Sequence, residues 1–335
     1  MSIDTTSTQA DKTPPPSAAT PRRKKIATGE GKLATRLIAP TLVLLGIVIL
    51  YPIGRAIYLS FLGDQQLSGA FFNKGGNFVG FKNYLDWILQ RCGNTSCQSS
   101  AIGGQTYDAL FVTVFFTVVS VVLEVILGMA MALVMNKSFR GRGLLRAAVL
   151  VPWAIPTAVT AKLWFFMLQF DGVVNHLFGL HVLWTDDLWP SRFAIILADT
   201  WKTTPFMALL ILAGLQIIPT DVYESAAIDG ATGIQAFRRI TLPLVKPALM
   251  VAVLFRVLDV LRIYDLPAIL THGGGGTGHA TTTLSILVVN EIQQGGFSSS
   301  SALSTLIFLF IFAVAYAFVR LLGVSAVQGQ QKAVK

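Results

Sequence analysis

The chain has 335 residues, of which 53% are hydrophobic and 13% are charged. Soluble domains carry about 25% charged residues, so this composition favours a protein of the lipid bilayer. The formal net charge is +9, but the basic residues stand at the ends of apolar segments and form no single patch. That distribution argues against nucleic-acid binding and indicates the orientation signal of a membrane protein, with membrane lipid as its surroundings.

The first residues are rich in Pro, Thr and Ser. They contain too little apolar surface to fold, so we expect a disordered, basic tail over residues 1–32. No apolar core precedes a small-residue cleavage site, and we therefore expect no removable signal peptide. The first membrane span would serve as the insertion signal.

Six later segments are long and apolar enough to cross a bilayer, which takes about 20 predominantly apolar residues. They are 33–61, 107–135, 144–170, 193–218, 247–270 and 302–322. The sequence thus predicts an all-α membrane protein, a six-span helix bundle. Its parts are a first transmembrane helix (33–62), an external loop (63–106), a core with five further spans (107–323) and a tail (324–335). Prolines inside several spans predict kinks, which neighbouring helices make tolerable in a bilayer.

Lys and Arg indicate the orientation, because cytoplasmic connections carry an excess of them. Basic residues gather before the first span and after the second, fourth and sixth, and include Arg22, Lys24, Lys32, Lys137, Arg140, Arg146, Arg238, Arg239, Lys246, Arg320 and Lys332. We therefore expect both termini in the cytoplasm and the segments 63–106, 171–192 and 271–301 outside.

The external segments carry few signs of chemistry. Cys92 and Cys97 lie in the first of them, and either a short disulfide-closed loop or two free thiols fits. The glycine-rich stretch of the third lacks the lysine of a phosphate-binding loop, so we interpret it as a flexible loop. The four histidines have no metal-ligand spacing; we expect them to be solvated, and we expect no metal site.

A polar stretch, residues 220–244, interrupts the apolar pattern on the cytoplasmic side. Asp221 and Glu224 have the spacing of a capping box for a short helix over 222–228. Gly230 breaks that helix, since glycine enters left-handed turns without cost. A second short helix follows, and Leu242 and Pro243 are expected to end it before the next span. With Ala226 and Ala227 facing outward, the stretch would form a knob that a cytoplasmic partner can push.

This stretch resembles the coupling loop of ABC importer permeases, in which Glu-Ala-Ala is followed at fixed spacing by Gly and by Ile-x-Leu-Pro. Here the matching residues are Glu224, Ser225, Ala226, Gly230, Ile240, Leu242 and Pro243, and only Ser225 departs from the pattern. We assign the coupling role to these seven together with Ala227 and Asp229. The other interpretation is an ordinary amphipathic connector between spans.

The resemblance extends over most of the chain and is strongest to the carbohydrate branch, the maltose- and trehalose-type permeases. It implies a non-catalytic membrane subunit in the cell membrane that takes up a sugar such as trehalose or maltose. The implied partners are a cytoplasmic dimer of ATP-binding subunits, a second homologous permease and an extracellular sugar-binding protein. ATP would be bound by the partner, so this chain needs no cofactor.

Charged and aromatic residues inside the fourth and fifth spans are candidates for the solute path, because ionisable groups in a span usually face a cavity or a partner. They are Asp199, Trp201, Lys202, Thr203, Arg256, Asp259, Arg262, Tyr264 and Asp265. Four of them recur every third residue with alternating sign, which predicts a neutralised ladder on one helix. These groups either contact solute or pair across helices to hold the bundle. Glu124, an isolated acid in the second span, would pair with Lys162 or an arginine.

Two other classes of function compete with an importer subunit. An ion-gradient-driven secondary transporter would show internal repeats and broken helices, and it leaves the cytoplasmic knob unexplained. A membrane enzyme would need a catalytic motif, and the sequence has no zinc-protease pair and no serine elbow.

Overall fold

The computed structural model describes residues 28–64, 76–89, 105–272 and 279–333, and side chains between 35 and 320 within those ranges. Cys92, Cys97 and most of the expected tail lie outside the described residues. Residues up to Ile53 form one compact unit and residues from Gly54 form another. The first unit holds α1 (Thr28–Leu45) and the π-turn η1 (Gly46–Leu50), whose large apolar side chains are exposed, as suits a helix in lipid.

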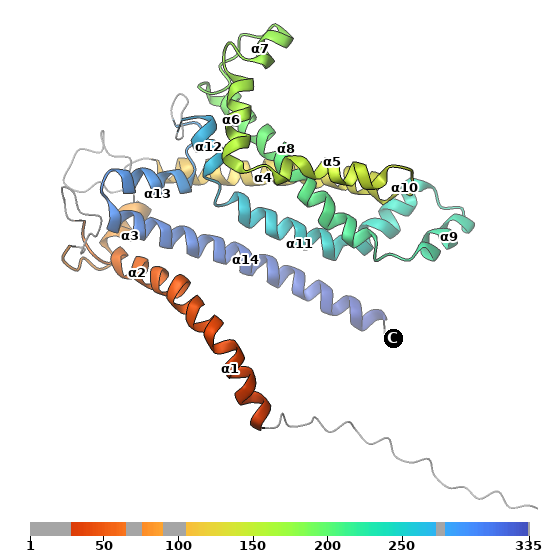
Figure 1. Ribbon diagram of the computed structural model, residues 1–335, viewed down its shortest axis with the longest axis horizontal. Coiled ribbons are helices and arrows are strands. Elements are labelled where there is room, and N and C mark those ends of the chain that lie inside the picture. The colour runs from red at the N-terminus through yellow and green to blue at the C-terminus, as the bar shows by residue number, and fades with distance from the viewer. Residues whose placement is uncertain (1–27, 65–75, 90–104, 273–278, 334–335) are drawn as a thin grey trace, which may run out of the picture. The chain divides into compact units, whose positions relative to one another are not determined.

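The regular secondary structure of the second unit is helical in its described residues, apart from one isolated β-bridge between Leu62 and Phe78. The elements run from α2, which begins before the unit boundary, to the C-terminal α14 (Figure 1). They are α2 (Tyr51–Ser60), α3 (Lys82–Leu89), α4 (Thr106–Asn136), α5 (Arg142–Ala154), α6 (Thr157–Leu168), α7 (Val173–Phe178), α8 (Leu188–Leu215), α9 (Thr220–Ile228), α10 (Gly233–Ala236), η2 (Phe237–Thr241), α11 (Leu242–Val260), α12 (Asp265–Leu270), α13 (Leu284–Gln293) and α14 (Phe297–Ala333).

Five helices of the described chain are long and apolar enough to cross a membrane, and a bent pair makes up to six. The five are Thr35–Ser60, Thr106–Asn136, Leu188–Leu215, Gly233–Val260 and Phe297–Arg320. The predicted helical membrane bundle is therefore confirmed in its coarse form. Two of the predicted spans, the third and the fifth, are wrong as continuous helices.

The third predicted span is broken into α5 and α6, which meet at an angle of 88°. Ile155, at the break, is extended (φ −74°, ψ 132°) and precedes Pro156. The proline ring disfavours the helical conformation in the residue before it, so the helix ends there.

The fifth predicted span ends early: its helix stops at Val260, and α12 starts afresh at Asp265. Pro267 has no backbone N–H to offer the carbonyl four residues earlier, and its ring would clash with that carbonyl. The carbonyl belongs to Ile263, and it accepts a hydrogen bond from the Thr283 hydroxyl instead (2.9 Å). The freed α12 packs on α6 (Figure 1).

The core of the bundle is the long contact of α4 with α8, against which α11 packs. Gly128 makes this contact close: a Cβ atom there would lie 2.9 Å from the Met207 side chain. Two clusters of buried apolar residues, one towards each end of α4, join the same three helices. The three helices form the frame that positions the polar residues described below.

The predicted external loop 271–301 is only partly a loop. It contains α13, whose Leu284, Ile286 and Leu287 are buried and which packs against α14. The preceding threonines are buried too, with Thr283 accepting from the Ile286 N–H (3.4 Å) as the helix cap. The local composition, rich in glycine and threonine, favours a loop, but packing against α14 stabilises the helix α13.

α13 also buries an acid. Glu291 is 4% exposed, and its Oε2 has no hydrogen-bond partner among the described residues. Burial raises the pKa of the Glu291 carboxyl above its ordinary value of 4.5, and the Asp64 carboxylate acts in the same direction, while a hydrogen bond from Ser299 opposes both. Asp64 itself accepts from the Ser298 and Ser299 N–H groups at the start of α14 (2.5 and 3.1 Å).

Enlarging Gly128 should separate α4 from α8. We expect Gly128→Leu to cost about 1–3 kcal/mol, since overpacking forces side chains off their rotamers. Gly143→Leu is the matched control, because nothing lies within 4 Å of a Cβ atom at Gly143. Thermal melting in detergent measures the difference, and equal melting temperatures would contradict a close α4–α8 contact.

Glu291 should make stability depend on pH. With the folded pKa raised, its contribution is fully present below the unfolded pKa and is lost as the pH rises through the folded value. Glu291→Gln is therefore expected to raise the apparent melting temperature at neutral pH, with the difference shrinking as the pH falls towards the unfolded pKa of about 4.3 and absent below it. Melting curves across that range test this, and a difference independent of pH would refute the ionisation argument.

Candidate coupling loop and solute path

The polar stretch folds as two short helices around a glycine turn. α9 ends at Ile228, and Gly230 takes a left-handed conformation (φ +76°), as expected from the sequence. The Ala231 N–H reaches back to the Ala226 carbonyl oxygen (2.9 Å), which closes the turn. An L-residue side chain disfavours this conformation, so glycine is required here.

The capping box predicted at Asp221 and Glu224 is wrong. Pro219 occupies the N-cap of α9, and no side chain caps it. The capping box forms one helix later, where Gln235 N–H donates to Thr232 Oγ1 (3.4 Å) and Thr232 N–H donates to Gln235 Oε1 (2.9 Å). The proline removes a hydrogen-bonding side chain from the N-cap position, whereas Thr232 provides one.

Leu242 and Pro243 do not end the second helix, contrary to the prediction. α10, η2 and α11 run on as one helix from Gly233 to Val260. The π-turn η2 makes this possible, because the Leu242 N–H bonds to the carbonyl of Phe237, five residues earlier. Pro243 then falls in the first turn of α11, where a missing N–H costs least.

The residues with the coupling-loop spacing are presented at the surface. Glu224, Ser225, Ala227, Asp229 and Gly230 are exposed, while Ala226, predicted to face outward, is half-buried. The Tyr223 hydroxyl lies 3.0 Å from Thr241 Oγ1 and ties α9 to the following helix. Ile240 is half-buried, and Leu242 and Pro243, further along this helix, are exposed.

A hollow lies between the two short helices. It is lined by Ala226, Asp229, Gly230, Ala231, Gln235, Ala236, Arg239 and Ile240. Small residues form its walls, and the exposed Arg239 and Asp229 supply charge at its rim. The loop is therefore a fixed, indented projection and not a featureless connector.

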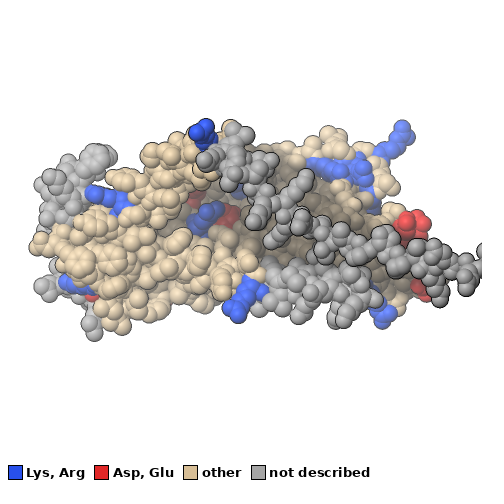
Figure 2. Space-filling model, turned by 90° about the horizontal axis from the view of Figure 1, so that it is seen from below, with Lys and Arg blue, Asp and Glu red and all other residues tan. Residues whose placement is uncertain are grey.

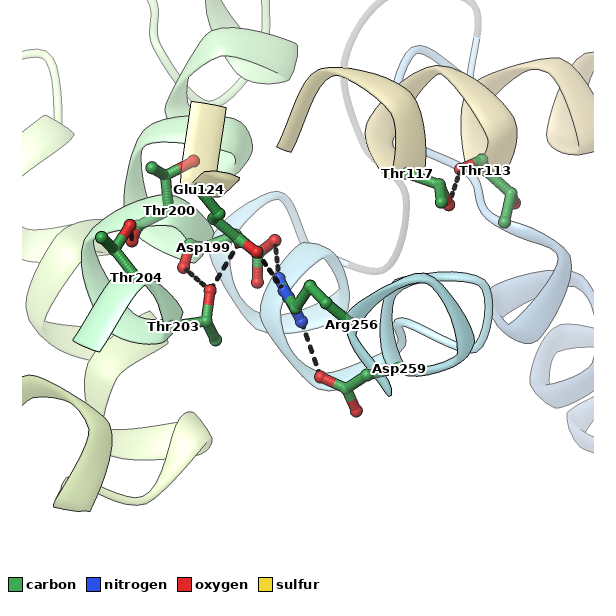
Figure 3. A network of polar contacts seen from close by, with 9 residues as sticks. All are labelled: Thr113, Thr117, Glu124, Asp199, Thr200, Thr203, Thr204, Arg256 and Asp259. Carbon is green, nitrogen blue, oxygen red and sulfur yellow. Dashed lines mark hydrogen bonds and ion pairs between the residues drawn. The ribbon is translucent and has the colours of Figure 1, made fainter. Parts of the chain in front are cut away.

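The second site is a cluster of charged residues in the interior of the bundle (Figure 3). Arg256 on α11 donates from Nε to Glu124 Oε2 on α4 (2.6 Å), from Nη2 to Asp199 Oδ2 on α8, and from Nη1 to Asp259 Oδ2 (2.6 Å). The Thr203 hydroxyl lies 2.6 Å from both Glu124 Oε1 and the Asp199 carbonyl oxygen. One guanidinium thus joins the three helices of the frame.

The members of this cluster differ in how far they are buried. Arg256, Glu124 and Asp199 are 3%, 0% and 5% exposed, whereas the Asp259 side chain is 57% exposed. The planar guanidinium suits this role because its donors form a rigid fork. Removing one partner from a buried ion pair leaves an uncompensated charge in a medium of low dielectric constant.

The other predicted solute-path residues lie around this cluster. Arg262 approaches Asp259 (3.8 Å) with a side chain that is 71% exposed. Lys202 is half-buried, and Trp201 meets Trp164 edge to face (ring centroids 5.9 Å apart). Tyr264 stands at the break and Asp265 on α12. The predicted ladder is therefore confirmed for Arg256, Asp259 and Arg262, which pair at spacings of three, and is wrong for Asp265. Among the described ion pairs, Asp265 takes part in none.

For Glu124 the sequence allows Lys162 or an arginine as partner, and the structure pairs it with Arg256. Lys162 instead lies over the Phe165 ring (5.2 Å from its centroid). The four histidines are exposed, as predicted. Two of them also contact a neighbour: the His272 ring packs on Phe165, and His279 Nε2 lies 3.0 Å from Gln105 Nε2.

A family comparison bears on both sites. Residues 124–325, which include the charged cluster and the coupling loop, match the model of the binding-protein-dependent transport system inner membrane component family. The chain belongs to that family. Its members are transport components, so this permease is no enzyme, and the alternative of an ion-gradient-driven secondary transporter is set aside.

Curated relatives cover nearly the whole permease. The trehalose/maltose transport system permease protein MalF of Thermococcus litoralis is 39% identical over 86% of this chain and 92% of its own length. The trehalose transport system permease protein SugA of Mycobacterium tuberculosis is 36% identical over 90% and 92%. The sulfoquinovosyl glycerol transport system permease protein SmoG of Agrobacterium fabrum is 34% identical over 88% and 91%.

The fold agrees with a solved importer. A chain of a bacterial ABC transporter for the acidic polysaccharide alginate superposes with a TM-score of 0.68, 22% sequence identity, and coverage of 90% of this permease and 96% of that chain. At that identity the likeness concerns the fold alone.

The charged cluster should be essential for the permease to fold. We expect Arg256→Met to cost about 3–5 kcal/mol, because two buried carboxylates lose their counter-ion. Arg262→Met is the matched control and should stay within about 0.5 kcal/mol, as exposed substitutions do. The amount of folded protein in the membrane and its melting temperature report the effect.

A rescue variant makes this test specific. Combining Arg256→Met with Glu124→Gln and Asp199→Asn removes the unpaired charges and should restore part of the lost stability. The cluster would have no structural role if Arg256→Met melted like Arg262→Met, or if the triple variant were less stable than Arg256→Met alone.

Proposed function

We propose that this permease is the membrane-spanning subunit of an ATP-driven, binding-protein-dependent sugar importer. The observation that carries the proposal is the projecting loop of α9 and α10, in which Glu224, Gly230 and Pro243 keep the coupling-loop spacing. A rigid indented knob fits the groove of a cytoplasmic ATP-binding subunit. ATP would be bound and hydrolysed by that partner, and this chain would bind no cofactor.

The partners follow from the same proposal. An ATP-binding dimer would close beneath the membrane, a second homologous permease would supply the other half of the path, and an extracellular sugar-binding protein would deliver the solute. Both termini would then lie in the cytoplasm, on the side of the loop and of the basic connections.

One continuous helix would carry the movement to the solute. The helix Gly233–Val260 begins in the coupling loop and ends beside Asp259. Ile240 and Arg256 are separated by about 24 Å along it, from a rise of 1.5 Å per residue. Displacement of the loop would move the charged cluster with it, because no break intervenes.

We place the solute path beside Asp259, Arg262 and Lys202. Asp259 and Lys202 lie within membrane spans and Arg262 stands just past the end of α11. Their charged side chains are exposed or half-exposed at a depth where contact with lipid is costly. One face of the described molecule is mostly uncharged, yet it shows a small group of both signs near its middle (Figure 2). A water-filled path that binds sugar hydroxyls through these groups, with the Trp201 ring against the sugar, accounts for that exposure.

We propose a disaccharide of the trehalose or maltose type as the solute. Two relatives that cover about nine-tenths of this chain's length have names that state trehalose transport. Asp259 is paired with both Arg256 and Arg262, which suits an uncharged, hydroxyl-rich molecule better than a strong anion.

Reversing the loop charge should uncouple the importer. We expect Glu224→Lys to leave the permease folded and inserted but to abolish most ATP-dependent trehalose uptake, since a lysine replaces the acid presented to the partner. Asp187→Lys, the same reversal at an exposed residue before α8, should leave uptake unchanged.

Uptake and ATP hydrolysis in proteoliposomes that contain the co-purified subunits measure this. Normal uptake by the Glu224→Lys permease would refute the coupling role. Purification of the chain without any ATP-binding subunit in mild detergent would refute the importer assignment itself.

A further inference from the structure

The short helix α3 exposes an apolar face, which is the reverse of what a helix in water presents. Its exposed face carries Phe81, Leu85, Ile88 and Leu89, which are 67%, 48%, 47% and 51% exposed. These positions are spaced so that they lie on one side of a helix. A segment between two membrane spans, predicted from composition to be an external loop, thus presents a continuous apolar stripe.

The opposite face of α3 is fixed to the bundle by polar contacts. Asn83 Nδ2 donates to the Ser60 and Leu62 carbonyl oxygens (2.8 and 2.7 Å), and the Tyr84 hydroxyl lies 2.5 Å from Ser60 Oγ. Trp87 is 1% exposed, and its indole N–H donates to the Ser299 carbonyl oxygen (2.9 Å). The orientation of the stripe is therefore set by the fold.

These contacts also fix the depth of α3. Trp87 bonds to the first turn of α14, and the Tyr107 hydroxyl in the first turn of α4 donates to the Ile88 carbonyl oxygen (2.8 Å). Both α4 and α14 are membrane spans that begin here, and Figure 1 shows α3 at this end of α14. A helix held at the first turns of two spans lies at the boundary between hydrocarbon and water.

The stripe continues into the surface that the spans present to lipid. On α4 the exposed apolar residues are Tyr107, Phe111, Val114, Val118 and Val122. Between α3, α4 and α14 a pocket is lined by apolar side chains, among them Ile88, Leu110, Leu306 and Phe310. The exposed Lys82, at the start of α3, lies at the edge of the stripe beside Leu89, where its long side chain can reach a phosphate headgroup.

We propose that α3 is an interfacial membrane helix whose stripe is inserted among phospholipid acyl chains, with one chain filling the pocket beside Tyr107. The occupant is lipid because the stripe is continuous with the lipid-facing side of α4 and lies at the level where the spans start. Inserted in this way, α3 would hold α2, α4 and α14 at a fixed depth in this leaflet.

Fluorescence quenching tests the insertion in the full-length chain, purified with its accompanying subunits and reconstituted in phosphatidylcholine nanodiscs. After Cys92→Ser and Cys97→Ser, Leu85→Cys and Leu89→Cys each receive an environment-sensitive fluorophore. Asp86→Cys, on the side of α3 turned away from Phe81, Leu85 and Ile88, is the matched control. We expect a nitroxide near the carbonyl end of the acyl chain to quench the two stripe positions. Aqueous iodide should quench them several-fold less than it quenches Asp86→Cys.

Two results would overturn the proposal. Iodide quenching at Leu85→Cys and Leu89→Cys equal to that at Asp86→Cys would place the stripe in water. Protection from both iodide and nitroxide would place another protein subunit on it.

A second measurement needs no substitution. Phosphatidylcholine with a photoreactive acyl chain should form adducts within residues 81–89 of the unmodified chain, mapped by mass spectrometry. Adducts on α4 around Phe111 serve as the internal control, and their formation without any in residues 81–89 would refute the insertion of α3.

Discussion

The interior of this permease depends on one guanidinium. Arg256 is placed where a charge is costly, and three carboxylates surround it, one from each helix of the frame, its own helix α11 included. Hydrophobic packing alone would let α4, α8 and α11 slide or rotate, since lipid is as apolar as their side chains. The directional hydrogen bonds of Arg256 specify one register among them, and Gly128 lets α4 and α8 come close enough to share it.

Prolines determine where the helices break or continue outside this three-helix frame. Pro156 marks the break between α5 and α6, and Pro267 lies in the first turn of α12, after the break in the fifth predicted span. The two segments that follow these breaks, α6 and α12, pack on each other. The backbone group released at Ile263 is satisfied by Thr283, which also caps α13. Pro243 has the opposite outcome, because a π-turn shifts the hydrogen bonds and the helix continues through it. The unbroken helix from loop to cluster is the mechanical basis of the proposed coupling.

The sequence was informative wherever a local property decided the structure. Apolar length predicted the spans, and Gly230 predicted the turn of the coupling loop because only glycine adopts its φ freely. The spacing of Glu224, Gly230 and Pro243 led to the transport family before any fold was visible. The capping box predicted at Asp221 was wrong, because Pro219 occupies the N-cap and has no side chain that can cap. The helix α13 was missed, because the glycines and threonines before it are typical of a loop.

The sequence by itself determined that this protein is a helical membrane permease with a knob of two short helices around Gly230, because bilayer thickness and turn geometry act over a few neighbouring residues. Only the tertiary structure decided which acid pairs with Arg256, where the third and fifth spans break, and that α3 turns its apolar face outward. Glu124 and Arg256 are 132 residues apart in the chain, and no local pattern joins them. Their pairing arises when three helices exclude water around one charge, which is a property of the packed bundle.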